Sequence, residues 1–94
     1  MTYKIELTPA AEKTLIKLAK GNHALVKKID KAIMGLANDP APLNSKQLSG
    51  EDPPLYRVRV GDYRILYQIE NDVLVVLVVH VGHRKDVYRF LKRQ

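Results

Sequence analysis

The sequence predicts an α+β domain in which a helical hairpin packs on one face of an antiparallel strand meander. Three observations predict it. An alternating apolar pattern opens the chain, two apolar stripes with helical spacing follow up to residue 36, and three strand-like patterns run from residue 55 to residue 81. The 94 residues are enough for one modest core. We therefore expect residues 1–94 to form a single domain.

The first segment is predicted to be a strand that leads directly into a helix. Tyr3, Ile5 and Leu7 alternate with polar residues, which is the period of a half-buried strand. Thr8 is suited to be a helix N-cap, and Pro9 follows at the first helical position, where its missing N–H is not needed. A helix is therefore expected to begin at Pro9.

Two helices are predicted to form an antiparallel hairpin. Gly21 is suited to end the first helix and Asn22 to cap the second, and so short a break places the helices side by side. The lysines along both helices are interpreted as a solvated face, with direct contact to a ligand as the alternative. The apolar stripes are Ala11, Leu15, Leu18 and Ala19 in the first helix, and Leu25, Ile29, Ala32, Ile33 and Leu36 in the second.

The segment from Asp39 to Pro54 is predicted to be an ordered loop. It contains Gly50 and four of the five prolines of the chain, and these residue types interrupt regular structure. At most a short turn is expected around Lys46 to Leu48.

Three strands are predicted after the loop, joined by tight turns at residues 61–62 and 71–72. The third, Val73 to Val81, is almost continuously apolar, as expected of a central strand covered on both faces. The core-facing sets are Tyr56, Val58 and Val60 in the first strand and Tyr63, Ile65, Tyr67 and Ile69 in the second, whereas Arg57, Arg59, Arg64, Leu66, Gln68 and Glu70 point the other way. A short C-terminal helix is expected over residues 86–92.

Composition limits the compartments and partners that we expect. The formal net charge of +6 favours a polyanionic partner, with simple solubility as the alternative. The chain has no cysteine, which excludes a disulfide framework and a thiolate metal site. No targeting pattern opens the chain, and the longest apolar run, Val73 to Val79, is far shorter than the roughly 20 residues of a membrane helix. We expect a soluble, cytoplasmic protein with no membrane partner.

The arginines are gathered in the second half of the chain. All six lie at or after Arg57, whereas most lysines precede the predicted strands. A planar guanidinium can hold two phosphate oxygens at once. Adjacent strands bring Arg57, Arg59 and Arg64 onto one surface, and the chain leaving the third strand places Arg84 and Tyr88 near it. We interpret this surface as a phosphate-binding site; the alternative is separate, exposed arginines.

The histidines and tyrosines leave alternatives open. His83 is a candidate general acid or base, or else an exposed loop residue. His80, inside the apolar strand, is expected to be a satisfied core or edge residue. For Tyr56, Tyr63 and Tyr67, burial is favoured over base stacking because they share the core-facing register. The histidines lack ligand spacing, so we expect no metal site, and neither a P-loop nor a dinucleotide fingerprint is present.

Several segments together match a known family. KQLSG, the strands LYRVRV and DYRILYQI, the apolar strand and VGHRKDVY occur here in this order. This combination resembles the RelE toxins of bacterial and archaeal toxin–antitoxin pairs, and the likeness covers nearly the whole chain. The resemblance implies a RelE-like compact domain.

The resemblance also implies an activity, partners and a site. The activity is that of a toxin that cleaves messenger RNA in the ribosomal A site, a ribosome-dependent endoribonuclease acting by attack of a 2′-hydroxyl on the adjacent phosphate. No cofactor or metal is implied, and the partners are a small antitoxin with an amphipathic helix, the ribosome and its message. The implied catalytic residues are Arg57, Arg59, Arg64, Arg84 and Tyr88, with His83 as a second candidate for proton transfer, and the RNA-binding residues are Arg57, Arg59, Arg64, Lys85 and Lys46.

The implied catalytic residues divide into those that stabilise charge and those that transfer a proton. Arginine is too weak an acid for ordinary proton exchange, so the arginines are expected to stabilise charge. Tyr88 is preferred as general base by the resemblance, with His83 as the other candidate. Two other functions remain open: a ParE-like toxin that inhibits DNA gyrase by binding, and a catalytically silent RNA-binding domain. The presence of Arg64, Arg84 and Tyr88 together favours the nuclease.

Overall fold

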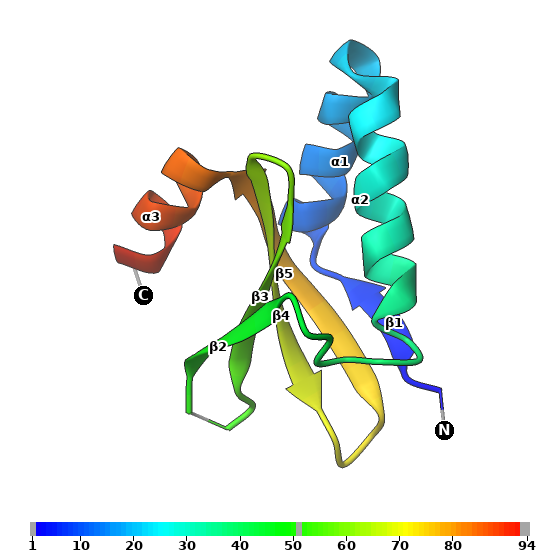
Figure 1. Ribbon diagram of the computed structural model, residues 1–94, viewed down its shortest axis with the longest axis vertical. Coiled ribbons are helices and arrows are strands. Elements are labelled where there is room, and N and C mark those ends of the chain that lie inside the picture. The colour runs from blue at the N-terminus through cyan, green and yellow to red at the C-terminus, as the bar shows by residue number, and fades with distance from the viewer. Residues whose placement is uncertain (1, 51, 93–94) are drawn as a thin grey trace.

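The computed structural model describes residues 2–50 and 52–92, apart from the side chain of Tyr88. A sheet lies between a pair of long helices on one side and a short C-terminal helix on the other (Figure 1). The elements in order are β1 (Lys4–Leu7), α1 (Pro9–Gly21), α2 (His23–Gly35), β2 (Ser45–Ser49), β3 (Leu55–Val60), β4 (Tyr63–Glu70), β5 (Val75–His83) and α3 (Arg84–Lys92). The predicted α+β class, helical hairpin and short C-terminal helix are confirmed.

The five strands form one sheet in the order β1-β5-β4-β3-β2. β1 pairs with β5 in parallel, and the other pairs are antiparallel. The predicted meander is therefore β3-β4-β5, extended by one strand at each edge.

The expectation of a loop from Asp39 to Pro54 is wrong for Ser45–Ser49, which forms β2. This edge strand pairs with β3, for example Lys46 opposite Arg57. Its side chains are half-buried or exposed, so it carries no apolar alternation. A strand at the border of a sheet is stabilised by pairing with a distant segment, which local periodicity does not reveal.

Three predicted boundaries also shift by two residues, one of them the end of the last strand, which lies at His83 instead of Val81. The last strand begins at Val75 instead of Val73, because residues 71–74 form the turn and Leu74 adopts a left-handed conformation with φ of 54°. The last helix begins at Arg84, directly after the strand.

The predicted caps hold the helical hairpin in place. Thr8 Oγ1 accepts a hydrogen bond of 3.2 Å from the backbone N–H of Ala11. Asn22 Oδ1 accepts one of 3.1 Å from the N–H of Leu25. Each cap satisfies an amide at a helix start that has no partner within the helix. No helix in the described part of the chain is long and apolar enough to cross a bilayer.

The core lies between this hairpin and the sheet. Tyr67 is fully buried within it, and its hydroxyl donates a hydrogen bond of 2.7 Å to the carbonyl of Pro40. Tyr56 stacks on Tyr67 with ring centroids 5.8 Å apart, and Tyr63 packs against the same cluster, so the predicted core register of the tyrosines is confirmed. Its buried members are Ala11, Ile29, Ile33, Leu36, Val58, Ile65, Tyr67, Ile69, Val76, Val78 and Val81.

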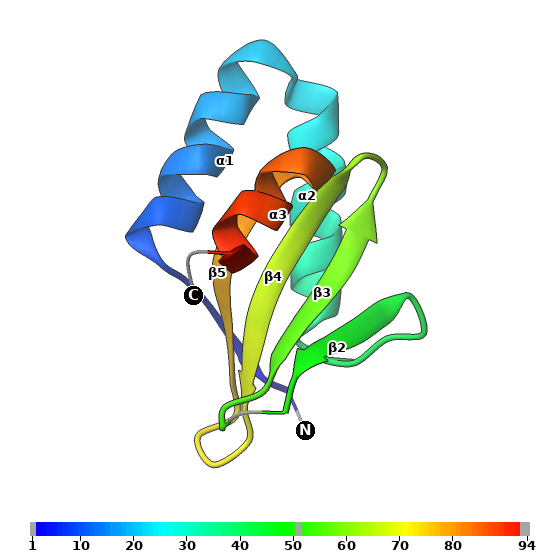
Figure 2. The same cartoon turned by 90° about the vertical axis from the view of Figure 1, so that its left-hand side faces the viewer.

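The opposite face of the sheet is covered only in part. α3 packs against β4 and β5, whereas β2 and β3 extend beyond it (Figure 2). The side chain of Leu66 on this face is fully buried. Several of the predicted site residues gather where α3 meets the uncovered strands.

Candidate functional site

The strand register brings the basic side chains of β2, β3 and β4 together on the α3 face of the sheet. Lys46 lies opposite Arg57, and Arg59 lies opposite Arg64. Neighbouring strands are about 4.8 Å apart, so four cations occupy two adjacent cross-strand rows.

α3 adds two more cations from the side. A pocket of about 620 Å³ is lined by Arg57, Arg64, Arg84 and Lys85 together with apolar side chains. The start of α3 is fixed because the N–H of Arg84 donates a 2.8 Å hydrogen bond to the carbonyl of Asp62. We call the group Lys46, Arg57, Arg59, Arg64, Arg84 and Lys85 the arginine surface. The apolar lining, which the sequence did not point to, comes from Leu48, Val87 and Leu91.

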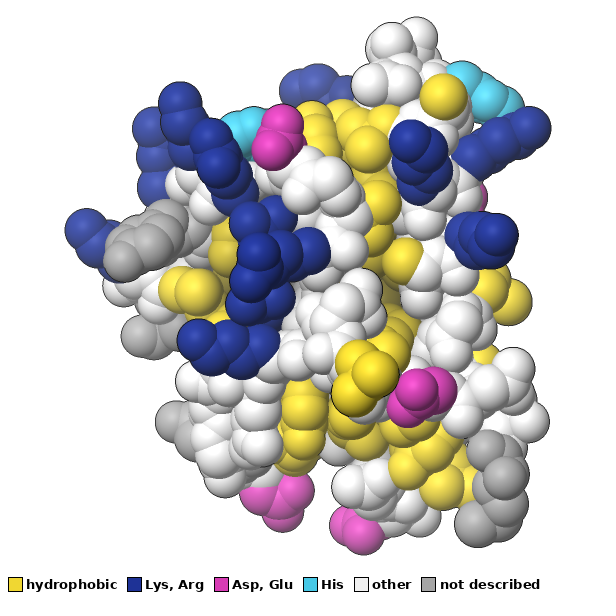
Figure 3. Space-filling model, in the orientation of Figure 1, with side chains coloured by type: hydrophobic (Ala, Val, Ile, Leu, Met, Phe, Trp, Pro, Cys, Tyr) yellow, Lys and Arg dark blue, Asp and Glu magenta, His cyan; other side chains and the backbone are white. Residues whose placement is uncertain are grey.

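The arginine surface carries a concentrated positive charge. Among the residues that the structure describes, no carboxylate forms an ion pair with its members. Burial, followed by the neighbouring charges of Arg59 and Arg64, lowers the pKa of Arg57 below its ordinary value. These surroundings disfavour the charged form of Arg57. An anion that binds beside Arg57 would stabilise that charged form. Figure 3 shows Lys and Arg side chains gathered around α3 and the adjoining sheet.

Arg64 is the most firmly held member of this surface. Its guanidinium donates hydrogen bonds of 3.2 Å to the carbonyls of Gly61 and Tyr63 at the β3–β4 turn. A guanidinium has five N–H donors, so others remain for a ligand. Arg64 is thus positioned before any ligand arrives.

His83 lies outside the pocket that Arg57, Arg64, Arg84 and Lys85 line. It pairs opposite Tyr63, whose side chain packs on the core, and the two rings meet edge to face at 5.7 Å. Its Nδ1 accepts a 3.3 Å hydrogen bond from the N–H of Lys85. The side chain lines a separate hollow of about 500 Å³ together with Tyr63 and Asp86. The structure therefore does not bring His83 into the pocket beside the arginine surface.

A register shift explains where the two histidines of β5 lie. Strict alternation would place His80 on the same face as Val76 and Val78. Between Leu66 and the next residue of β4 the register shifts, and His80 pairs with Leu66 on the α3 face. An extra residue in one strand exchanges the faces of all side chains beyond it.

His80 departs from the expectation of a satisfied core or edge residue. Its ring stacks on Phe90 of α3, with centroids 4.4 Å apart and planes inclined by 12°. Its Nε2 is buried, and no hydrogen-bond partner for it exists among the described residues, so the expectation of satisfaction is wrong. No sequence motif marks the contact, because Phe90 comes from the next element.

The last predicted site residue is Tyr88, in α3. Its side chain lies outside the described residues.

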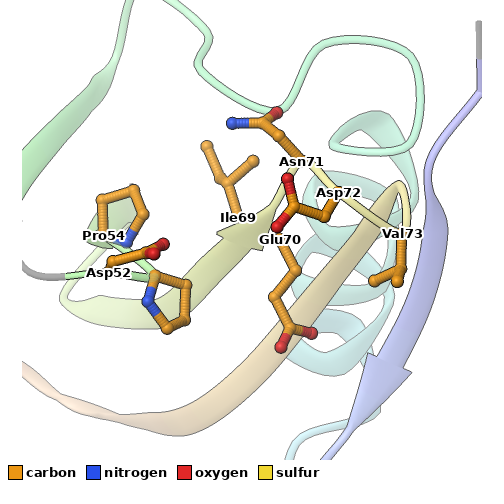
Figure 4. A pocket seen from close by; sticks show the side chains of 8 residues that line it. Asp52, Pro54, Ile69, Glu70, Asn71, Asp72 and Val73 are labelled. Carbon is orange, nitrogen blue, oxygen red and sulfur yellow. The ribbon is translucent and has the colours of Figure 1, made fainter.

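The opposite end of the sheet is acidic. A hollow of about 400 Å³ is lined by Asp52, Glu70 and Asp72, together with prolines and the 71–74 turn (Figure 4). Glu70 lies six residues after Arg64 on β4, which is about 20 Å along an extended strand. Among the described residues no three or more His, Cys, Asp or Glu side chains are grouped to hold a metal ion. The charge of the sheet is therefore divided between its two ends, and only the basic end suits a phosphate.

Comparison with known proteins finds relatives over nearly the whole chain. The family described as the ParE toxin of the type II toxin–antitoxin system parDE matches residues 5–88. Toxin RelG of Mycobacterium tuberculosis is 33% identical over 89 residues, which cover 95% of this chain and 99% of that protein.

Two crystal structures share the fold. The archaeal RelE–RelB complex from Pyrococcus horikoshii OT3 contains a chain with 27% identity and a TM-score of 0.76, covering 89% of this chain and 97% of that chain. The toxin–antitoxin complex RelBE2 from Mycobacterium tuberculosis has 26% identity and a TM-score of 0.73, covering 88% and 92% of the respective chains. The family match over residues 5–88 includes the strands that carry the arginine surface.

Proposed function

The chain belongs to the RelE/ParE superfamily of type II toxin–antitoxin toxins, and from this membership we propose that it is a ribosome-dependent endoribonuclease that cleaves messenger RNA in the ribosomal A site. The observation that supports the proposal is the arginine surface, which gathers six cations beside a pocket without a described carboxylate partner. Such a surface suits an RNA phosphate and the additional charge that develops on it during cleavage.

The proposed reaction is an internal transfer. A base removes the proton of a 2′-hydroxyl, the 2′-oxygen bonds to the adjacent phosphorus, and the bond to the 5′-oxygen breaks as that oxygen takes a proton. The products are a 2′,3′-cyclic phosphate and a 5′-hydroxyl. Arg64 and Arg84 line the pocket from two elements and are proposed to stabilise the pentavalent phosphorus, while Arg57 and Arg59 hold the flanking backbone.

Proton transfer is proposed for Tyr88 as general base. A tyrosine accepts a proton as its phenolate, and the proposed role requires that form. His83 is the second candidate. It lies on the core side of the sheet, so its participation would require the chain end or the substrate to approach it.

We also propose a cognate antitoxin as partner. Two solved relatives are a RelE–RelB complex and a toxin–antitoxin complex. The proposed antitoxin is a small protein with an amphipathic helix that binds this domain and blocks its action.

Toeprinting on programmed ribosomes tests the proposal. The wild type should cut the message in the A site, and Arg84→Ala and Tyr88→Phe should cut at least about 100-fold more slowly. This is the lower end of the usual cost of losing a group that stabilises charge in the transition state, proposed for Arg84, or a general base, proposed for Tyr88. Lys20→Ala, at the exposed end of α1, is the matched control and should cut normally.

Two outcomes would contradict different parts of the proposal, the nuclease activity and the assignment of its residues. If the wild type arrests growth while the message on ribosomes stays intact, the nuclease proposal is wrong. If both variants cut as fast as the wild type, the activity stands and the assignment of residues is wrong.

The family description favours one second candidate, inhibition of DNA gyrase, because the matching family is that of ParE. A supercoiling assay with purified gyrase separates the two functions. Inhibition by the wild type without any cleavage on ribosomes would support the second.

A further inference from the structure

α3 is a short element that depends on a few contacts. It has nine residues, and a helix of this length is marginal in water by itself. Its apolar contacts to the sheet include Val87, which is 7% exposed, and Phe90, which stacks on His80. The same helix carries Arg84 and Lys85 of the arginine surface. Whatever fixes α3 also fixes where these two cations lie.

His80 lies in the same cross-strand row as two members of the arginine surface. The cross-strand register gives a row that runs from Lys46 through Arg57 and Leu66 to His80. The next row runs from Arg59 through Arg64 to Gly82.

Gly82 provides the space that the imidazole fills. A Cβ at residue 82 would lie 2.7 Å from His80 Nε2, a distance that real Cβ atoms do not show. The absence of a side chain at Gly82 lets the ring of His80 lie flat beneath Phe90. The imidazole thus stacks on Phe90 and lies close to Gly82.

We infer that His80 is a positioning residue of the arginine surface: its imidazole, lying over Gly82 and stacked on Phe90, docks α3 so that Arg84 and Lys85 meet Arg57 and Arg64. The contact acts through α3 and does not itself touch the pocket of the four cations. The part of this inference that concerns RNA rests on the proposed function, whereas the docking of α3 does not.

The surroundings of His80 make the docking sensitive to pH. Burial lowers the pKa of His80 below its ordinary 6.5, and Asp86 of α3 opposes that effect. The other ionisable groups that line the adjoining hollow are Lys17 of α1, Tyr63 of β4 and His83 of β5. The docked form therefore holds fewer protons than the undocked form. Docking is fully present above pH 6.5 and weakens as the pH falls through that value.

Nuclear magnetic resonance and hydrogen exchange on the full chain test the docking directly. In the wild type, ring protons of His80 should be shifted upfield by Phe90, and this shift should vanish in Phe90→Leu. From pH 7.5 to pH 5.5 the protection of the α3 amides, corrected for intrinsic exchange, should fall by at most about tenfold. The reason is that an exposed imidazole with its ordinary pKa is about ten-elevenths protonated when the pH is one unit below that pKa.

Two substitutions separate packing from titration. His80→Ala removes the stack and should reduce α3 protection about threefold to tenfold at pH 7.5, since an aromatic pair contributes about 0.5–1.5 kcal/mol. His80→Phe keeps a ring but cannot be protonated, so its protection should not change between the two pH values. His23→Ala, at the exposed start of α2, is the control and should behave as the wild type. Because His80→Phe keeps a buried ring, it tests the inference even if His80→Ala does not fold.

Binding of a single-stranded RNA oligonucleotide, measured by fluorescence anisotropy, is the second arm. The wild type should lose affinity between pH 7.5 and pH 5.5 more than His80→Phe does. Equal α3 protection in the wild type and His80→Ala, or the same pH dependence in the wild type and His80→Phe, would overturn the inference. If no RNA binds at either pH while α3 responds as described, the proposed function fails and the docking role stands.

Discussion

Arg59 of β3 lies directly opposite Arg64 of β4, so two like charges face each other across neighbouring strands. Such a pair weakens a sheet, because side chains in this position are about 5 Å apart at Cβ. Arg59 is exposed and Arg64 is half-buried, and no described carboxylate pairs with either. The arrangement fits the proposed function, in which an RNA phosphate supplies the counter-charge.

Removing Arg59 should therefore stabilise the fold and weaken RNA binding. We expect Arg59→Gln to raise the free energy of unfolding by up to about 0.5 kcal/mol at low salt, measured by urea denaturation. The gain should shrink at high salt, because exposed charges are screened. Lys13→Gln on α1, which has no cross-strand arginine, should show no such gain. A variant less stable than the wild type would mean that Arg59 has a stabilising contact.

Salt dependence should report how many cations of the arginine surface touch phosphate. On single-stranded RNA, each lost phosphate contact should reduce the slope of log affinity against log salt by about 0.7. We expect this change for Arg57→Ala and for Lys46→Ala in anisotropy titrations. Lys28→Ala on the helical hairpin should keep the slope of the wild type. If it changes the slope as much, the RNA covers the hairpin as well.

The hydroxyl of Tyr67 should stabilise the fold in a pH-dependent way. It donates to Pro40, so Tyr67→Phe should cost about 1 kcal/mol at neutral pH. Burial raises the pKa of Tyr67 from 10.0 to about 12. The folded state therefore loses stability as the pH rises from 10 towards 12, since the unfolded chain ionises first.

Alkaline unfolding checks this sign. Followed by circular dichroism, the difference between Tyr67→Phe and the wild type should narrow above pH 10. A difference that widens would mean that the phenolate is tolerated in the core.

Gly82→Ala should disturb α3, because its methyl group would collide with His80 Nε2. We expect a loss of about 1–3 kcal/mol, as for other overpacked sites. The double variant with His80→Ala should recover part of this loss, since the colliding atom is gone. Gly35→Ala, where nothing lies within 4 Å of the new methyl, is the control and should not destabilise. Equal stability of Gly82→Ala and the wild type would show that the ring moves aside without cost.

The sequence was sufficient for features that depend on local chemistry. Thr8 and Asn22 cap the predicted helices, and Tyr67 falls in the predicted core. The convergence of Arg57, Arg59 and Arg64 followed from alternation along two strands that a short turn joins. β2 was missed, because an exposed edge strand is held by pairing with β3 and carries no apolar pattern.

Only the tertiary structure decided how the histidines relate to the arginine surface. His83 and Arg84 are neighbours in sequence, yet His83 packs beside Tyr63 while Arg84 lines the arginine pocket. The physical reason is the register shift in β5, which exchanges the faces of the residues beyond it and turns His80 towards Phe90. The sequence by itself determined which charges the surface holds. Pairing between distant strands determined which side chains share a face with them.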